Sequence, residues 1–168
     1  EVNEIARRYA RLRIASAVLR KTMDRYRQTA QGPVLGRASD VFARITAGSF
    51  QELRTGFDER DQQVIQGVRT GSVPLGVEAM SEGTRDQLYL ALRIGTLEHY
   101  LTQNEAMPLI LDDILVNFDD ERAAATLHVL AEVAQRTQVL FFTHHRHLIE
   151  IARNTLPPTA LAEHQIAR

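Results

Sequence analysis

Residues 108–113 read Pro-Leu-Ile-Leu-Asp-Asp, and residues 139–145 read Val-Leu-Phe-Phe-Thr-His-His. Each segment is a short apolar run that ends in polar side chains. Such runs are typical of strands that are buried on both faces. We expect a helix between them, from about residue 119 to 135, because residues 119–121 are all acidic and carboxylates suit a helix N-terminus. Strand, helix and strand together predict a parallel α/β layer.

A third segment, residues 80–85, reads Met-Ser-Glu-Gly-Thr-Arg and precedes a long helix that we expect from about residue 84 to 103. The Ser81 hydroxyl and free backbone amides near Gly83 can form an anion site at a helix N-terminus. A Ser-Glu-Gly turn can also cap a helix without binding anything. These residues alone leave both interpretations open.

Asp112 and Asp113 end the first apolar run. Successive strand residues point to opposite sides, but a strand end can release the second side chain into a cleft. The simpler alternative is that two acidic residues cap a strand-to-loop turn. A metal-dependent nuclease is a further alternative, with a carboxylate cluster formed by Asp112, Asp113, Asp119 and Asp120.

Two more groups of polar residues follow the apolar runs. Asn117 and Asp119 lie in an Asn-Phe-Asp sequence, and both residue types are also favoured in turns and caps. His144 comes directly after Thr143, and a neutral imidazole there can hydrogen-bond a phosphate or a water. A zinc site of His144, His145 and His147 is disfavoured, because the chain has no cysteine and no spaced set of partner ligands.

In this order, the three segments resemble the C-terminal lobe of an ABC-type ATPase head of the SMC/RecF/YhaN kind. The resemblance implies an α/β fold, half of an ATPase head, with a short parallel β layer, helices and a small β-meander. It implies that Asp112 is the Walker B aspartate that supports Mg²⁺ and that Asp113 is the general base. Most ABC ATPases carry glutamate there, so the geometry for polarising water would differ. The catalytic switch histidine would be His144, with His145 as the alternative.

The same resemblance implies two nucleotide-binding motifs, the signature with Ser81 and Gly83 and the D-loop with Asn117 and Asp119. In the family, the signature reaches across a dimer and closes on ATP that the partner's Walker A holds. Three neighbouring positions depart from the commonest signature, but the serine and the glycine are retained.

The chain has no Walker A loop, which reads G-x-x-x-x-G-K followed by Ser or Thr. Residues 71–76 have the glycine spacing, but Val77 and Glu78 follow, and Lys21 is the only lysine. We therefore expect ATP and Mg²⁺ to bind only when a Walker A lobe is present. The expected partners are that lobe, from the same parent chain or a separate one, and a second head in an ATP-bound homodimer. DNA is a further candidate partner.

Residues 1–30 are predicted to form a coiled-coil-like helix, with residues 31–168 forming the head lobe. The helix has apolar residues in steps of three and four, interrupted by Ser16. The seam consists of Val2, Ile5, Tyr9, Leu12, Leu19, Met23 and Tyr26. An amphipathic helix that lies on its own domain is the alternative. Gln31-Gly32-Pro33 is expected to end the helix.

Within residues 31–168, a second helix is expected from about residue 34 or 39 to residue 47. Short alternating runs at residues 50–57, 63–69 and 74–77 then predict a small antiparallel β-meander.

The net charge of −1 hides an asymmetry, since residues 1–28 carry eight basic and three acidic side chains. The arginines suit a nucleic-acid backbone or, equally, a solvated helix face. No apolar run approaches the ~20 residues that span a bilayer, and no signal peptide opens the chain. We expect no membrane partner and a cytoplasmic location. A first residue Glu1, without methionine, favours a fragment of a longer protein.

The sequence thus predicts an ATP-binding and hydrolysing head lobe whose composite site is completed by a lobe outside this chain. The parent protein is expected to be an ATPase, which converts ATP and water to ADP and phosphate, in DNA repair or chromosome maintenance. Whether the lone chain is an enzyme stays open. The alternative is a catalytically silent dimerisation module derived from such a head.

Overall fold

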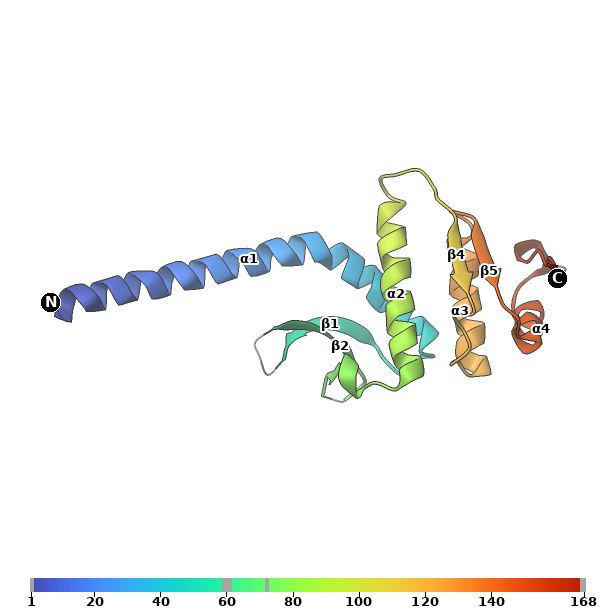
Figure 1. Cartoon of the computed structure of the whole chain (residues 1–168), viewed down its shortest axis with the longest axis horizontal. Coiled ribbons are helices and arrows are strands. Elements are labelled where there is room, and N and C mark those ends of the chain that lie inside the picture. Colours follow the sequence, from blue (N-terminus) through green and yellow to red (C-terminus); the bar gives the residue numbers. More distant parts are fainter. Residues whose placement is uncertain (1, 59–61, 72, 167–168) are drawn as a thin grey trace. The chain divides into compact units, whose positions relative to one another are not determined.

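The computed structural model describes the backbone of residues 2–58, 62–71 and 73–166 (Figure 1). Within the first helix, it describes the side chains of residues 7–19, 21 and 22 and those from residue 32 onwards. The chain divides into two compact units, Glu1–Pro33 and Val34–Arg168.

Helix α1 spans Val2–Ile45, so the predicted break at Gln31-Gly32-Pro33 is wrong. A proline inside a helix removes one backbone donor and costs about 3 kcal/mol. The turns that follow bury Val41, Phe42 and Ile45 in the main core. Burial of each such side chain contributes about 1.5–3 kcal/mol, which stabilises the part of α1 that follows Pro33.

In the N-terminal unit, every described side chain from residue 7 to 22 is exposed. Those of the predicted seam include Tyr9, Leu12 and Leu19, each more than 60% exposed. The other apolar seam positions lie outside the described side chains, namely Val2, Ile5, Met23 and Tyr26. The described seam residues therefore have no cover within their own unit.

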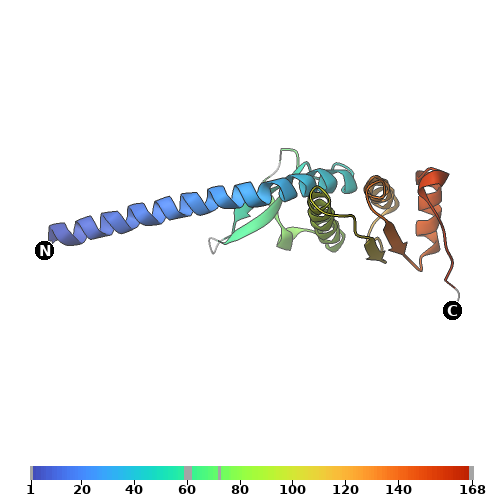
Figure 2. The same cartoon turned by 90° about the horizontal axis from the view of Figure 1, so that it is seen from above.

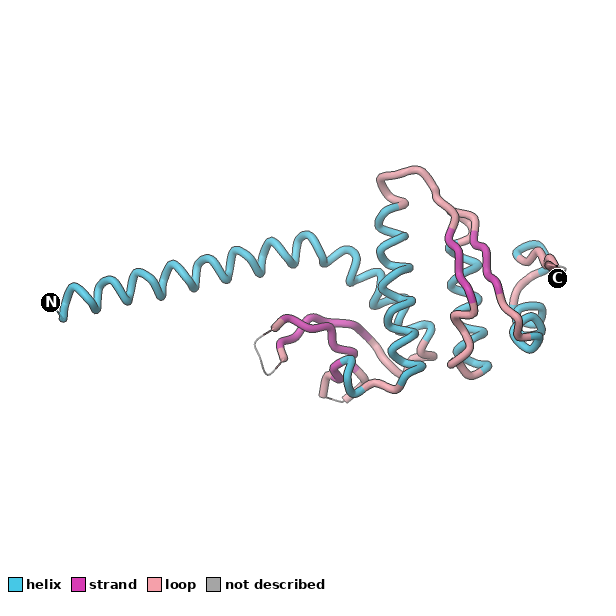
Figure 3. The backbone as a smooth tube through the Cα atoms, viewed as in Figure 1, coloured by secondary structure: helices cyan, strands magenta, loops and turns pink. Residues whose placement is uncertain are grey.

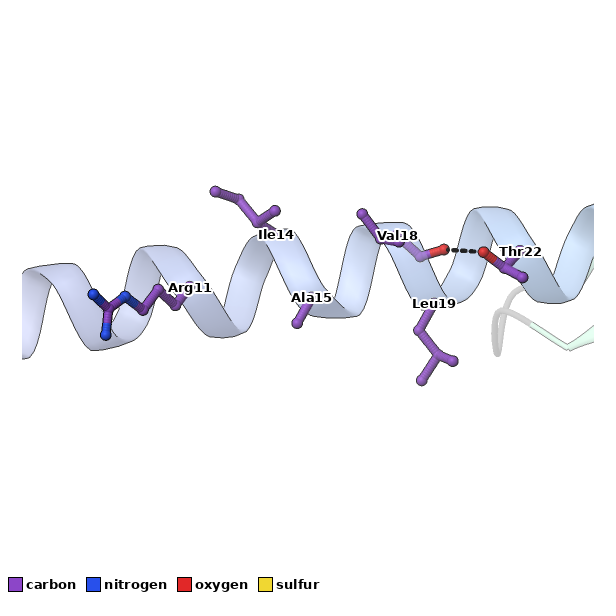
Figure 4. Close-up of a pocket in the computed structure, with 6 residues that line it drawn as sticks. All are labelled: Arg11, Ile14, Ala15, Val18, Leu19 and Thr22. Atoms are coloured by element: carbon purple, nitrogen blue, oxygen red, sulfur yellow. Dashed lines mark hydrogen bonds between the residues drawn. The ribbon is translucent and has the colours of Figure 1, made fainter.

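The apolar surface of this part of α1 is not confined to the predicted seam. Figure 4 shows Ile14 and Val18 pointing to one side of the helix and Ala15 and Leu19 to the other. The Thr22 hydroxyl donates a hydrogen bond to the Val18 carbonyl at 2.9 Å and so turns its polar group back to the helix. Large apolar side chains are thus exposed on more than one side of α1.

The predicted β-meander is confirmed. Strands β1 (Glu52–Phe57), β2 (Gln63–Val68) and β3 (Leu75–Gly76) form an antiparallel sheet in chain order. A short 3-10 helix, η1 (Val77–Ala79), leads from this sheet to residue 81. The sheet joins the main core through the buried Leu53 side chain.

The predicted parallel α/β layer is also confirmed (Figure 3). Strands β4 and β5 pair in parallel, and α3 connects them, as strand-helix-strand patterns require. The elements in chain order are α2 (Glu82–Tyr100), β4 (Leu109–Asp112), α3 (Asp120–Val133), β5 (Val139–Phe142), α4 (Arg146–Thr155) and η2 (Pro158–Ala160). In the described part of the chain, no helix is both long and apolar enough to cross a membrane.

The two faces of the β4–β5 sheet differ. On one face, Leu111 is 3% exposed and packs in a cluster with Val129 and Leu130 of α3, which runs along the sheet in Figures 1 and 2. On the other face, Ile110 is 62% exposed and Phe142 is 40% exposed. This second face is therefore largely exposed within the described chain, with Leu140 half-buried on it.

Close contacts fix α1, α2 and α3 to one another. A Cβ on Gly95 of α2 would lie 2.7 Å from the backbone nitrogen of Ala38, so the glycine lets α2 approach the backbone of α1. Arg44 of α1 donates hydrogen bonds to both carboxylate oxygens of Glu132 on α3, at 2.7 and 2.5 Å. These helices form the support from which the loops after β4 and β5 extend.

Candidate functional site

The carboxyl ends of β4 and β5 bring two predicted site residues together. The strands are parallel and in register, with Asp112 opposite Phe142. The register continues for one residue, because the Asp113 N–H donates to the Phe142 carbonyl at 2.9 Å. Asp113 and the residues after β5 therefore emerge at the same edge of the sheet.

Asp113 and His144 are in direct contact. Nδ1 of His144 hydrogen-bonds Oδ2 of Asp113, and the His144 backbone N–H donates to Oδ1 at 3.3 Å. Both carboxylate oxygens are thus held by the same residue. The His144 side chain is 75% exposed, so its ring is open to a ligand, whereas that of Asp113 is 28% exposed.

Asp113 has a left-handed backbone conformation, with φ of +47°. Aspartate and asparagine adopt this region several-fold more often than other non-glycine residues. The turn directs the side chain towards β5 rather than onward along its own strand. This conformation is how the second acid of the pair reaches the histidine.

Thr143 also holds this carboxylate, although the sequence patterns did not point to it as a functional residue. Its hydrogen bond to Asp113 is the main cause that lowers the pKa of Asp113 below its ordinary value, and contacts with His144 lower this pKa further. The same hydroxyl oxygen accepts the His145 backbone N–H at 3.1 Å. The only sequence signal for this role was a hydroxyl residue between an apolar strand and a histidine.

These contacts determine what the pair can do chemically. A lowered pKa keeps Asp113 ionised at neutral pH and therefore able to accept a proton, but it also makes the group a weaker base. A neutral His144 that donates Nδ1–H to the carboxylate leaves Nε2 as an acceptor. The pair can thus orient a water molecule between a carboxylate and an imidazole.

Ser81 is the N-cap residue of α2. Its Oγ accepts the Thr84 N–H at 3.3 Å and lies 2.8 Å from the Thr84 hydroxyl oxygen. The side chain thus performs the capping role that was the simpler alternative for this segment. Ser81 is nevertheless exposed at the start of a 19-residue helix, where backbone N–H groups and the dipole favour an anion.

Gly83 brings the start of α2 against the loop before α3. A Cβ at Gly83 would lie 2.6 Å from the backbone oxygen of Asn117, closer than real side chains approach. The Asn117 side-chain amide in turn donates to Asp86 of α2 at 2.8 Å. The predicted signature and D-loop segments therefore touch. Asp86 was not singled out, because its role depends on a residue 31 positions away.

Asp119 and Asp112 lie apart from these contacts. Asp119 caps α3, where its carboxylate accepts the Arg122 N–H at 2.9 Å and pairs with the guanidinium at 3.4 Å. Asp112 is exposed at the end of β4. Within the described ranges, the one group with metal-ligating geometry consists of Asp113, His144 and His145. The four-aspartate nuclease cluster gains no support from this arrangement.

The structure thus forms two clusters of predicted site residues. One contains Asp113 and His144 at the end of the parallel sheet. The other contains Gly83 and Asn117 at the start of α2, with Ser81 as its cap. Across the described residues, no hydrogen bond or ion pair joins the two clusters.

One curated relative has clear sequence similarity to the chain. This is YhaN of Bacillus subtilis (strain 168), an uncharacterized protein, which is 33% identical over 149 residues. The match covers 88% of this chain and 15% of that protein, so the chain spans only about one seventh of the relative's length. No protein-family model matches the chain.

Solved SMC structures share the fold. A structure from work on ATP-driven dimerization and DNA-stimulated activation of SMC ATPases is 18% identical, with a TM-score of 0.60 over 74% of this chain and 75% of that one. The Smc head with coiled coil and joint from Pyrococcus yayanosii is 16% identical, with a TM-score of 0.58 over 84% of this chain and 27% of that one. The Smc head of Pyrococcus furiosus bound to a ScpA domain is 19% identical, with a TM-score of 0.56 over 72% of this chain and 30% of that one. At these low sequence identities, it is the TM-scores that show a shared fold.

Proposed function

Because this chain is similar in sequence to YhaN and has the SMC head fold, it is a segment of an SMC/YhaN-like ATPase head, and we propose that it is the catalytic C-terminal lobe of that head. In this proposal, the lobe supplies the signature, Walker B, D-loop and switch histidine to a composite ATP site. A lobe outside this chain supplies Walker A. The observation that carries the proposal is the contact between Asp113 and His144 where two parallel strands end.

The proposed hydrolytic step is transfer of the γ-phosphoryl group of ATP to water. Asp113 accepts the proton of the attacking water, and His144 orients that water through Nε2, which the contact with Asp113 leaves free. A contact from His144 Nε2 to a phosphate oxygen would instead require the protonated imidazole, since only that form donates from both nitrogens. His144 is favoured over His145 as the switch residue because it is the one bonded to the carboxylate.

Asp112 is the proposed ligand for Mg²⁺. Its carboxylate is exposed at the end of β4, and Mg²⁺ prefers such hard oxygen ligands and retains several of its waters. When bound, Mg²⁺ would neutralise phosphate charge. The chain itself provides no Walker A lysine, so this carboxylate is only one part of the site.

Ser81 and the N-terminus of α2 are proposed to contact the γ-phosphate that a second head holds. Ser81 is an exposed residue, and it caps only the Thr84 N–H, so earlier N–H groups at the start of α2 can bind an anion. Gly83 couples this helix to Asn117, and Asp119 fixes the start of α3. Asn117 and Asp119 are thus suited to respond when a partner head closes on the signature.

The open face of the β4–β5 sheet supports the proposal of a missing lobe. Parallel sheets occur almost only with both faces covered. Ile110 and Phe142 are exposed on this face, near the end of the sheet that carries Asp113 and His144. A Walker A lobe that covers them would complete both the core and the site.

We extend the proposal to the whole protein as an ATPase that dimerises through its heads. Dimerization driven by ATP and activation by DNA are described for SMC ATPases of the same fold. For this protein, DNA as a partner and a cytoplasmic role in DNA repair or chromosome maintenance rest on that likeness. Stimulation of ATP turnover by added DNA tests this extension.

Reconstitution tests the proposed site. The chain is co-expressed with the Walker A lobe of the longer protein, and Mg-ATP binding and phosphate release are measured for each part and for the complex. We expect turnover only in the complex. Tight ATP binding by the lone chain would contradict the assignment of the phosphate site to another lobe.

Two substitutions sharpen this test. Asp113→Asn, which tolerates the left-handed backbone, should reduce turnover at least 100-fold while ATP still binds. Ser81→Arg should abolish turnover and ATP-driven dimerisation with nucleotide binding retained. Asp40→Asn, at an exposed position on α1, is the matched control. Dimerisation without any turnover in the unsubstituted complex would favour the silent dimerisation module instead.

A further inference from the structure

The structure assembles three metal-ligating side chains that come from two separate segments. Ligand atoms of Asp113, His144 and His145 all lie within 4.8 Å of one another. Asp113 follows β4, and the two histidines follow β5, 31 residues later in the case of His144. From the sequence alone, a zinc site of neighbouring histidines was disfavoured because no spaced partner ligand was evident, whereas the fold adds a carboxylate from another strand.

We propose that Asp113, His144 and His145 bind a single transition-metal ion of the Zn²⁺ or Co²⁺ type, with water at the remaining positions. Two imidazoles and one carboxylate are a donor set that such ions favour, whereas Mg²⁺ takes oxygen ligands and water. The site therefore differs in chemistry from the Mg²⁺ position proposed at Asp112.

The cluster needs little rearrangement to close around an ion. Metal–ligand bonds of about 2.0–2.2 Å place tetrahedral ligand atoms roughly 3.4 Å apart. Ligand atoms that lie within 4.8 Å of one another must therefore approach by at most about 1.4 Å, while His144 Nδ1 and Asp113 Oδ2, which are already in contact, must move apart. The side chain of His144 is 75% exposed, and its ring stacks on that of His145 with centroids 3.9 Å apart. Exposed rings turn at little cost. The ion replaces the hydrogen bond between His144 Nδ1 and Asp113 Oδ2.

Outer contacts already hold the ligands in place. The His144 backbone N–H donates to Oδ1 of Asp113 at 3.3 Å, and the Thr143 hydroxyl also bonds this carboxylate. The Thr143 oxygen accepts the backbone N–H of His145 at 3.1 Å. Such second contacts orient ligands in metal sites and usually strengthen ion binding.

Binding of a metal ion at this site would affect ATP hydrolysis, an inference that rests on the proposed function. A metal ion on Asp113 and His144 uses the same atoms that would orient and deprotonate water. Binding of the ion and hydrolysis are then mutually exclusive, and Zn²⁺ at the site inhibits the reconstituted ATPase.

The test uses the untagged 168-residue chain without nucleotide, so its result does not depend on whether the head hydrolyses ATP. Co²⁺ is titrated and followed by its visible absorption, and Zn²⁺ binding is measured by calorimetry in the presence of excess Mg²⁺. We expect one ion per chain, with no displacement by Mg²⁺. Absence of a visible Co²⁺ band or competition by Mg²⁺ would overturn the proposal.

Variants identify the ligands. Asp113→Asn and His145→Gln should each weaken Zn²⁺ binding at least tenfold, because each removes one strong ligand. His147→Gln and His128→Gln are the controls and should bind as the unsubstituted chain does, since neither residue belongs to the cluster. Loss of binding in His147→Gln together with unchanged binding in Asp113→Asn would establish a surface chelate of histidines and refute this site.

Discussion

At the scale of single residues, Asp113 combines an unusual backbone with a fully engaged carboxylate. Its φ of +47° turns the side chain towards β5, where His144 and Thr143 bond it. These contacts stabilise the ionised form and so oppose strong basicity.

Thr143→Val tests the cause of the altered acidity. Valine has nearly the same shape but no hydroxyl, so the pKa of Asp113 should rise towards the ordinary value of about 3.9. Carbon-detected NMR titration of the Asp113 carboxyl, assigned with Asp113→Asn, measures the change. Identical midpoints in the two proteins would show that Thr143 does not control this group.

The direction of the shift also fixes a pH dependence. Because the pKa of Asp113 is lowered in the folded chain, its contribution to stability is fully present above the unfolded-state value of about 3.9. That contribution is lost as the pH falls through the folded-state value. Thr143→Val should therefore lose less stability than the unsubstituted chain on acidification through this window.

At the scale of elements, the start of α2 and the loop before α3 behave as one unit. Gly83 leaves room for the Asn117 carbonyl, and the Asn117 side chain bonds Asp86 one turn further along α2. In the proposed function, these contacts would pass a motion of the start of α2, the proposed signature, to the loop at Asn117, the proposed D-loop. This coupling is local and does not require the second lobe.

Gly83→Ala tests that close approach. A Cβ 2.6 Å from a backbone oxygen must displace it, and such overpacking costs about 1–3 kcal/mol. Helix propensity returns up to about 1 kcal/mol, so we expect a net loss of roughly 1 kcal/mol in the free energy of unfolding. Urea unfolding measures it.

Gly36→Ala provides the matched control for this substitution. Gly36 also lies in a helix, but a Cβ there meets no atom within 4 Å. Only the propensity effect remains, so this variant should be more stable by about 0.5–1 kcal/mol. Equal stabilisation in both variants would mean that the backbone at Asn117 shifts to make room for the added Cβ without a measurable cost.

At the scale of the whole molecule, the two faces of the parallel sheet in the Val34–Arg168 unit differ: one packs into the core and the other exposes apolar side chains. The covered side packs Leu111 against α3, while the opposite side exposes Ile110 at 62%. In the proposed function, one second lobe accounts for both the open face of the sheet and the lack of a Walker A sequence.

Ile110→Thr tests the role of this face. Threonine keeps the β-branched shape, so the lone chain should change in stability by no more than about 0.5–1 kcal/mol. Binding to the Walker A lobe, measured by calorimetry, should weaken at least tenfold. Val73→Thr, at a position that is 86% exposed, should leave binding unchanged. Equal binding by both variants would show that the partner lobe lies elsewhere.

Much of the fold could be predicted because its signals are local. The apolar runs at β4 and β5 and the alternating runs of the meander place every strand correctly. The end of α1 at Ile45 lies close to the expected end near residue 47, but its continuity through Pro33 was not predicted, because Pro33 argues locally for a break. The turns after Pro33 are stabilised by core contacts such as those of Phe42 and Ile45, which no local pattern contains.

The sequence by itself determined the residue types and their order: a serine and glycine before a helix, acids after one apolar strand and histidines after the next. Only the tertiary structure decided which of them meet. Parallel pairing of β4 with β5 brings Asp113 to His144 and Thr143, and the approach of α2 to the loop at Asn117 explains Gly83. The physical reason is that hydrogen bonds and steric contacts form only between atoms that are close in space. Residues 30 or more positions apart in the sequence come that close only when the chain folds.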